Sequence, residues 1–391
     1  MGCCSSTDEK SVKSKSNQKQ KSNVSYDNLL NYTDSNIPMP NNQQPILQSN
    51  GLIPINVGEF DDGQQDKKVL LLGSGECGKT TIWKQLKITD CGGFDDSERE
   101  SFIPGIKLAI LFDMKLVLEE LTDLGVTVPN NLENDKETLD TLFQESLTDE
   151  SLTAEVADMI YRVWNDPQIQ HVYKQVFYES CGIGENAPYF FENVMRISDG
   201  DYIPSDEDIL KIRIRTTGMS SMPFIINHDI KLLLVDLGGQ ISERGKWRNG
   251  FKNTNYIMYV ISLSDFDQKC FDSDDYRTND SLSLFQEIAN QEHLKSIPFF
   301  LILNKTDLFK EKLSDPQSQP QFKRAYPDYE GEVSSVNYKQ CLDHIKKTYL
   351  KKAEQRQKGA EIIPIETCAM DKDSISDLFQ KIAFRVNNDN K

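Results

Sequence analysis

The amino-acid sequence predicts an α/β fold that is interrupted by a long helical insertion. First, the apolar run 69–72 leads into a glycine-rich segment, 73–80, and then into helical sequence. Second, three later apolar runs each end in a short polar motif. Third, apolar residues between positions 89 and 208 recur at helical spacing. A chain of 391 residues exceeds one ordinary domain, which favours two folded units and a tail.

The first residues predict attachment to a membrane. Gly2 and Ser6 fit the pattern for N-myristoylation, and Cys3 and Cys4 provide adjacent thiols for S-acylation. One acyl chain binds only marginally, so a second chain or a basic patch is needed. A basic patch is present in the first 21 residues: Lys10, Lys13, Lys15, Lys19 and Lys21. The same residues hold no apolar run that predicts a signal peptide or a transmembrane helix. An unmodified, disordered polar start is the alternative.

Composition predicts that residues 1–66 form a flexible, lipid-anchored tail. Residues 5–66 are rich in Ser, Asn, Gln and Lys, and prolines recur between positions 38 and 54. Such a segment buries too little apolar surface to offset the entropy of ordering. The prolines exclude one continuous helix across 38–54 and leave at most a short helix near 26–32.

Segment 73–80 has the form Gly-x-x-x-x-Gly-Lys-Thr and predicts a phosphate-binding loop. Glycine lets successive backbone N–H groups turn toward one anion, and the side chain of Lys79 can reach the outer phosphates. The Thr80 hydroxyl is placed to ligate Mg²⁺ at the start of a helix. This loop alone predicts binding of a nucleoside triphosphate without indicating which one.

Residues 89–208 predict an all-helical domain. Its longest helix is marked by apolar residues three and four positions apart: Ile106, Ile110, Met114, Val117, Leu121 and Leu124. Pro104 is expected in the first turn of this helix, and Gly125 at its C-terminal cap. Further helical runs are expected to pack around it, at 136–148, 151–165, 169–179 and 188–196. The insertion can close over a nucleotide like a lid, or it can be a decoration; both interpretations stay open.

Two later apolar runs end in residues suited to magnesium and to guanine. Run 231–237 leads into Asp236-Leu-Gly-Gly-Gln240. There Asp236 can hold a Mg²⁺-bound water, and Gly239 can bring its N–H to a terminal phosphate because no side chain blocks the approach. Run 298–303 leads into Asn304-Lys-Thr-Asp307. The Asp307 carboxylate can accept hydrogen bonds from the N1–H and the amino group of guanine, which adenine does not offer.

The last apolar run, 362–366, leads into Thr367-Cys368-Ala369, whose backbone can address the guanine carbonyl. Each motif is weak alone, but their order, each at the end of an apolar strand, predicts a guanine nucleotide site. Asn304 and Asp307 disfavour the competing interpretation of a P-loop kinase or ATPase. A final helix is indicated by an apolar face made of Ile375, Leu378, Phe379, Ile382 and Val386.

Charge and cysteine content exclude several other classes of protein. The net charge of -17 argues against nucleic acid as a partner. The eight cysteines are scattered apart from Cys3 and Cys4, and they show no metal-ligand spacing with the four histidines. This usage is typical of an intracellular protein without a disulfide framework.

On these residues the chain resembles the alpha subunits of heterotrimeric G proteins, over most of positions 67–387. Three segments that small GTPases lack carry the resemblance beyond the shared motifs. Residues 208–218 are similar to the first switch of the family, with Arg213 built in. Residues 238–247 are similar to its second switch, and residues 262–285 to the strand and third switch that follow. The insertion itself lies where a small GTPase has a short loop.

The resemblance implies a Ras-like P-loop GTPase domain with a mostly parallel, six-stranded sheet. This domain is expected at 67–88 and 209–391, interrupted by the helical domain 89–208. The implied function is a switch in signal transduction that binds GTP, hydrolyses it to GDP and acts downstream of G-protein-coupled receptors. Gln240 is implied to orient the attacking water, and Arg213 to stabilise the transition state in cis.

The resemblance also implies a ligand set. Thr80 and Thr216 are the implied ligands of Mg²⁺, with Asp236 acting through water. The implied nucleotide-binding residues are Gly73, Ser74, Gly75, Glu76, Cys77, Gly78, Lys79, Thr80, Thr81, Leu210, Arg213, Thr216, Asp236, Gly239, Asn304, Lys305, Asp307, Cys368 and Ala369.

The implied partners are a beta-gamma dimer, a seven-transmembrane receptor and an effector, with the chain held by acyl chains on the cytoplasmic face of the plasma membrane. Some features depart from the family. The tail lacks a long N-terminal helix, and the polar end 387–391 replaces an apolar receptor-binding tail. Ile241 and Gly245 replace basic residues of the second switch, and Met370 replaces a threonine. The competing hypothesis is a GTP-binding scaffold that works outside a conventional heterotrimer.

Overall fold

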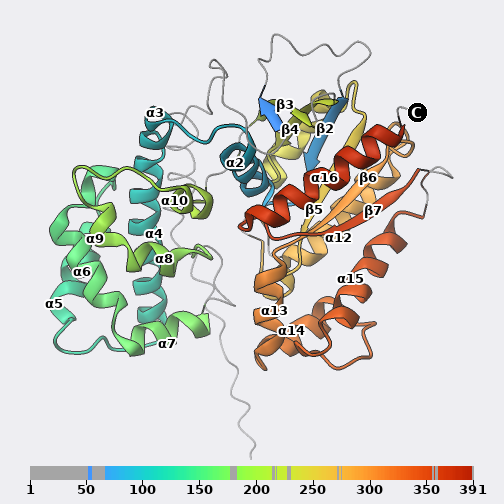
Figure 1. The fold of residues 1–391 in the computed structure, drawn as a ribbon. Helices are drawn as coiled ribbons and strands as arrows, with labels where there is room; N and C mark the ends of the chain where they lie inside the picture. Colours follow the sequence, from blue (N-terminus) through green and yellow to red (C-terminus); the bar gives the residue numbers. More distant parts are fainter. Residues whose placement is uncertain are drawn as a thin grey trace, which may run out of the picture.

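The computed structural model describes residues 52–54, 67–176, 183–213, 216, 218–226, 230–270, 273, 275–354, 356 and 360–389. Helices alone form one lobe, and a sheet covered by helices forms the other (Figure 1). The predicted α/β fold with a helical insertion is therefore confirmed. Within these residues, no helix combines the length and the apolar character that crossing a membrane requires.

The sheet has the strand order β1-β3-β4-β2-β5-β6-β7. The strands are β1 (Leu52–Pro54), β2 (Lys67–Leu72), β3 (Met219–Ile226), β4 (Ile230–Leu237), β5 (Tyr256–Ser262), β6 (Phe299–Asn304) and β7 (Ile362–Glu366). β3 is antiparallel to β4, whereas the neighbours from β4 through β2, β5 and β6 to β7 pair in parallel. The predicted six strands thus correspond to β2–β7. β1 adds an antiparallel edge strand beside β3, so the flexible-tether interpretation does not extend to residues 52–54.

Helices cover both faces of this sheet. They are α2 (Lys79–Asp90), α11 (Trp247–Gly250), α12 (Arg277–Asn290), α13 (Thr306–Ser314), α14 (Ser318–Ala325), α15 (Tyr338–Lys352) and α16 (Lys372–Asp389), with the 3₁₀ turns η3 (Ile241–Lys246) and η4 (Asp265–Asp267). Val69 and Leu71 of β2 belong to the core shared with α2 and α16. Leu70 and Leu72 belong to the core shared with α12 and α15. Alternate residues of one strand therefore serve two cores, as expected for a strand buried on both faces.

The predicted apolar face of the last helix is confirmed. In α16 the side chains of Ile375, Leu378, Phe379, Ile382 and Val386 are all buried. They pack in the same core as α2, which follows the phosphate-binding loop. The helix that positions this loop is therefore fixed between the sheet and the C-terminal helix.

The other lobe consists of helices from one stretch of chain. They are α3 (Asp96–Glu100), α4 (Ile103–Asp123), α5 (Glu133–Leu142), α6 (Ala154–Trp164), α7 (Pro167–Val176), α8 (Ala187–Glu192), α9 (Val194–Ile197) and α10 (Asp206–Lys211), with the 3₁₀ turn η2 (Asp149–Ser151). In Figure 1 the long helix α4 runs through this lobe, with α6, α8 and α9 beside it. An all-helical insertion around one long helix is what the spacing predicts.

The long helix α4 follows the prediction closely. Pro104 lies in its first turn, and the predicted core face is buried except at Leu124. Leu124 is 54% exposed, so its assignment to the core is wrong. The reason is that α4 ends at Asp123, and Gly125 turns the chain with a φ of 66°.

Two predicted helix boundaries in this lobe are wrong. The run 136–148 stops being helical after Leu142, where α5 ends. The run 188–196 is divided into α8 and α9 at Asn193. The Asn193 side chain donates to the carbonyl oxygen of Tyr189 at 2.9 Å. The same carbonyl also accepts from the Asn193 N–H at 3.2 Å, so the side chain shares the acceptor of a regular helical bond where the run divides.

Candidate functional site

A cavity lies at the carboxyl ends of the parallel strands and is lined by residues from both lobes. Its lining contains most of the residues that the sequence analysis named: Gly75, Glu76, Gly78, Lys79, Thr80, Thr81, Leu210, Arg213, Thr216, Gly239, Gln240, Asn304, Lys305, Asp307, Cys368 and Ala369. Gly73, Ser74, Cys77 and Asp236 are buried beside them. The acylation residues Gly2, Cys3 and Cys4 lie outside the described part of the chain.

Asn304 joins the phosphate-binding loop to the base motifs. Its Nδ2 donates to the carbonyl oxygen of Cys77 at 2.9 Å, and its Oδ1 accepts from the N–H of Ala369 at 3.0 Å. The approach depends on Gly78, which has a φ of 97° and whose Cβ would lie 2.2 Å from Nδ2 of Asn304. One buried amide therefore ties together three segments that are far apart in the chain.

The ammonium group of Lys79 lies inside the loop. Its Nζ donates to the carbonyl oxygens of Gly73 and Ser74 at 3.1 and 2.7 Å. Gly239 approaches the same group, since a Cβ there would lie 2.3 Å from Nζ. Phosphate oxygens carry a full negative charge and are stronger partners for an ammonium than these carbonyls are. The arrangement therefore suits the capture of a phosphate.

Thr80, Thr216 and Asp236 form a cluster of oxygen atoms next to Lys79. The Oγ1 atoms of Thr80 and Thr216 are 2.6 Å apart, and that of Thr80 donates to Asp236 Oδ2 at 2.9 Å. Burial raises the pKa of Asp236, although the charge of Lys79 and the hydrogen bond from Thr80 oppose the shift. Its Oδ1 is buried and has no hydrogen-bond partner in the described part of the chain. Hydroxyl and carboxylate oxygens suit Mg²⁺, and the orphaned oxygen fits a metal-bound water.

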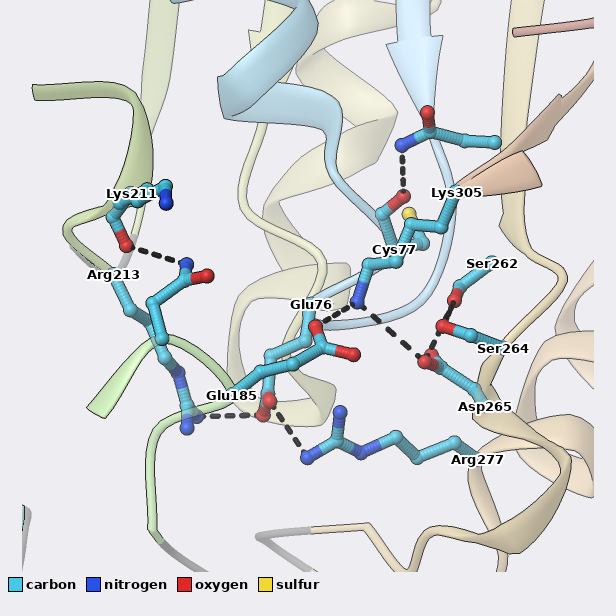
Figure 2. A network of polar contacts seen from close by, with 12 residues as sticks. Glu76, Cys77, Glu185, Lys211, Arg213, Ser262, Ser264, Asp265, Arg277 and Lys305 are labelled. Atoms are coloured by element: carbon cyan, nitrogen blue, oxygen red, sulfur yellow. Dashed lines mark hydrogen bonds and ion pairs between the residues drawn. The ribbon is translucent and has the colours of Figure 1, made fainter. Parts of the chain in front are cut away.

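Arg213 enters the cavity from the segment after α10 and is held by Glu76 (Figure 2). Its Nη2 lies 2.6 Å from Glu76 Oε1, and Nη2 of Arg277 lies 2.6 Å from Glu76 Oε2. Burial would raise the pKa of Glu76, but the charges of the two arginines outweigh it and lower the pKa below its ordinary value. Glu76 therefore stays ionised and fixes Arg213 beside the phosphate-binding loop.

Lys84 of α2 holds the segment before Arg213 and was missed by the sequence analysis. Its buried Nζ donates to the carbonyl oxygens of Ile209 and Ile212 at 2.9 and 3.1 Å. Burial lowers the pKa of Lys84 to about 7, against the opposing charge of Asp236. A lysine in a helix carries no sequence signal that it is buried, so this residue could not be distinguished from its exposed neighbours.

Gln240 rests against the phosphate-binding loop. A Cβ on Gly75 would lie between 2.9 and 3.0 Å from the atoms of its side-chain amide. Nearby, Arg244 anchors the second-switch segment by donating to the carbonyl oxygen of Gly239 at 3.1 Å and to Asp280 at 2.7 Å. This segment thus presents a polar amide to the cavity on a fixed backbone.

Ile241 and Gly245, the two residues of segment 238–247 that depart from the family, lie outside the cavity. Ile241 is 44% exposed, and a Cβ on Gly245 would meet open space. Neither is among the residues that line the cavity. Their departure from the family therefore concerns a surface and leaves the cavity unchanged.

The end of the cavity where the sequence predicts the guanine base is lined by residues from segments 304–308 and 368–370. Lys305 takes a left-handed conformation, with a φ of 61°, at the cap of α13. Asp307 follows in the first turn of α13, with its side chain exposed to an incoming ligand. Met370, which departs from the family, also lines this end.

The helical lobe contributes residues that the sequence analysis missed. They are Ala109, Asp113, Gly184, Glu185, Asn186, Ala187 and Phe190. Glu185 Oε2 lies 2.6 Å from Lys305 Nζ, which is also 3.6 Å from Asp265 (Figure 2). Burial would raise the pKa of Glu185, but the charges of Lys305 and Lys312 and the hydrogen bond from Lys305 together lower the pKa to about 2. This ion pair joins the lobes and favours the lid interpretation of the insertion over the decorative one.

Comparisons with known proteins point to one family. The sequence model of a family described as G-protein alpha subunit matches residues 55–385. The chain is 35% identical over 309 residues to a guanine nucleotide-binding protein subunit alpha of Emericella nidulans, covering 78% of this chain and 83% of the relative. The G-protein complex alpha subunit gpaA of Aspergillus fumigatus is similar to the same extent, with 35% identity and coverage of 78% and 83%. The guanine nucleotide-binding protein alpha-1 subunit of Neurospora crassa is 34% identical over 307 residues, again covering 78% and 83%.

Proposed function

The chain belongs to the family of G-protein alpha subunits, and on this premise we propose that it hydrolyses GTP in the cavity between the two lobes, with Gln240 and Arg213 as the catalytic residues. Membership makes the chain a GTP-binding signalling switch with GTPase activity. The assignment of roles to residues rests on one observation above all. Lys79, Gln240, Arg213 and the oxygen cluster of Thr80 and Thr216 border a single cavity.

Phosphoryl transfer to water needs positioning and charge neutralisation, with little covalent chemistry from the protein. Lys79 and the backbone N–H groups of segment 73–80 bind the β- and γ-phosphates. The amide of Gln240 orients the water for in-line attack on the γ-phosphorus. Arg213 donates to the oxygens that gain charge as the bond between the γ-phosphorus and the bridging oxygen breaks. Mg²⁺, held by Thr80, Thr216 and through water by Asp236, would neutralise charge on the same phosphates when bound.

We expect Gly75→Ala to slow hydrolysis by up to about 10²-fold, the cost of displacing a catalytic group by roughly 1 Å. The added Cβ would lie within 3.0 Å of the Gln240 amide, so the amide must move away from the loop. Gly245→Ala is the matched control, because a Cβ there meets open space. Single-turnover hydrolysis of bound GTP compares the two. Equal rates in Gly75→Ala and the parent would show that hydrolysis does not need Gln240 at this position.

We also propose bounds for the two domains and a test of the partners of the switch. Residues 67–88 and 209–391 form the GTPase domain, and residues 89–208 form the helical domain. Family membership implies beta-gamma dimers and receptors as partners in general. A pull-down that compares the GDP-bound and the GTP-analogue-bound chain, scored for beta-gamma, tests whether this chain keeps such partners despite its unusual ends.

The acylated tail is proposed to hold the chain on the cytoplasmic face of the plasma membrane. Gly2→Ala is expected to release the chain into the soluble fraction, because it removes the first lipid chain. Replacing both Cys3 and Cys4 by serine should leave weak binding, since one myristoyl chain is marginal and each nearby lysine adds about 1 kcal/mol at an anionic leaflet. That residual binding should fall as salt is added.

Fractionation at low and high ionic strength measures all three forms, with Ser5→Ala as a control that keeps the acylation pattern. If Gly2→Ala stays fully on the membrane, protein partners hold the tail and the lipid proposal fails.

A further inference from the structure

We infer that Asp113 is a positioning residue that sets how long a guanine nucleotide stays bound, because its carboxylate fixes the loop that joins the helical lobe to the guanine motif. This inference rests on the proposed function. Asp113 lies in the middle of α4, is 3% exposed and lines the cavity. A carboxylate that is buried among the apolar core residues of α4 needs a partner that compensates its burial.

The backbone of Gly184 is one such partner. Asp113 Oδ1 accepts from the N–H of Gly184 at 2.8 Å. A Cβ on Gly184 would lie 2.9 Å from Asp113 Oδ2, so only glycine permits this approach without displacement. The contact holds residues 183–186, here termed the bridging loop, against α4.

The bridging loop carries two contacts to segments that line the nucleotide cavity. Glu185 forms the 2.6 Å ion pair with Lys305, next to the guanine-reading Asp307. Asn186 Nδ2 donates at 2.8 Å to the carbonyl oxygen of Lys211, at the end of α10. The loop thus reaches both the base motif and the chain that leads into Arg213.

A nucleotide enclosed between the lobes leaves when these contacts break. Their strength depends on where the bridging loop is held, and Asp113 holds it. Without the carboxylate, the Gly184 N–H loses its acceptor and Glu185 and Asn186 lose their fixed backbone. Nucleotide release then becomes faster. The step that Asp113 controls is therefore the release of the nucleotide.

The dissociation rate of radiolabelled GDP from the purified full-length chain tests this directly. Asp113→Ala is expected to raise the rate about tenfold, as loss of one hydrogen bond to a buried charged group would. Asp113→Asn keeps an oxygen acceptor and is expected to stay near the parent rate. Single-turnover hydrolysis of GTP, measured on the same three proteins, separates an effect on release from an effect on the chemical step.

Asp135→Ala is the matched control for a loss of stability in the helical lobe. Asp135 is buried in α5 and accepts two hydrogen bonds from Arg162 at 2.8 Å, away from the bridging loop. Its removal should leave the GDP dissociation rate unchanged. If Asp113→Ala also leaves this rate at the parent value, or Asp135→Ala raises it equally, the inference is overturned.

Two double variants separate action through the loop from direct contact with the nucleotide. Gly184→Ala alone should speed release, because the added Cβ would clash with the Asp113 carboxylate. It should have no further effect when Asp113 is already alanine, because that clash is then absent. The effects of Asp113→Ala and Glu185→Gln on the GDP dissociation rate should likewise be less than additive, because both substitutions weaken the connection that the bridging loop makes to Lys305. Full additivity in either pair contradicts the loop mechanism. Failure of the parent chain to bind GDP at all would instead refute the proposed function.

Discussion

Arg213→Cys is expected to leave GTP bound and to slow its hydrolysis by about 10³ to 10⁵, the contribution of an arginine that stabilises a transferred phosphoryl group. The guanidinium is already fixed beside the phosphate-binding loop, 2.6 Å from Glu76. Gln240→Leu is expected to act similarly, because leucine cannot orient the attacking water. Rates are measured in single turnover with radiolabelled GTP, so that slow release of GDP does not hide the chemical step.

Arg248→Cys provides the control for the arginine. Arg248 is exposed in α11, close to the second switch in the chain, and does not line the cavity. Its hydrolysis rate should equal that of the parent. Parent-like hydrolysis in Arg213→Cys would show that Arg213 does not act in cis and would contradict its assigned role.

Asp307→Asn is expected to weaken GTP binding by roughly 10⁴-fold, because the asparagine NH₂ group would then face an N–H donor of guanine. A site built to accept two hydrogen bonds discriminates strongly against such a mismatch. In the proposed role the carboxylate accepts from the N1–H and amino group of guanine, whereas the asparagine amide offers a donor to the oxygen that replaces the amino group in xanthine. The variant should therefore prefer xanthosine triphosphate. Competition of guanosine and xanthosine nucleotides for the site measures this preference.

Glu311→Gln tests whether the effect is specific. Glu311 is an exposed acidic residue in the same helix, α13, and does not line the cavity. It should keep the nucleotide preference of the parent. Unchanged GTP affinity in Asp307→Asn would mean that another group reads the base.

The fold was most predictable where one segment carries its own pattern. β2, β6 and β7 end in recognisable motifs, and α4 and α16 show their core faces in the spacing of apolar residues. β1 could not be predicted, because Leu52–Pro54 becomes a strand only beside the edge that β3 offers. Within β3, Pro223 interrupts the strand pattern, and pairing with β4 decides its structure.

The residues of the site likewise fall into those that the sequence predicts and those that it does not. Residues of contiguous motifs, such as Lys79 and Asp307, could be named because a short segment sets their geometry. Asp113 and Glu185 could not, since their approach to the cavity depends on how the helical lobe packs. Asp113 stands between core residues of α4, where its spacing alone does not distinguish it from a solvent-facing acid. Glu185 belongs to none of the motifs, and no sequence pattern indicates that it meets Lys305.

The most direct measurement is hydrolysis of bound GTP by the purified chain alone, with no partner protein added. Because Arg213 and Gln240 both belong to the chain, we predict release of one phosphate per bound GTP, at a rate on the order of 10⁻² s⁻¹, as is typical of alpha subunits with arginine in cis. Removal of Mg²⁺ with a chelator should abolish this release. GTP that stays bound but unhydrolysed over many minutes in Mg²⁺ would contradict the catalytic assignment and would favour a scaffold that signals by nucleotide occupancy.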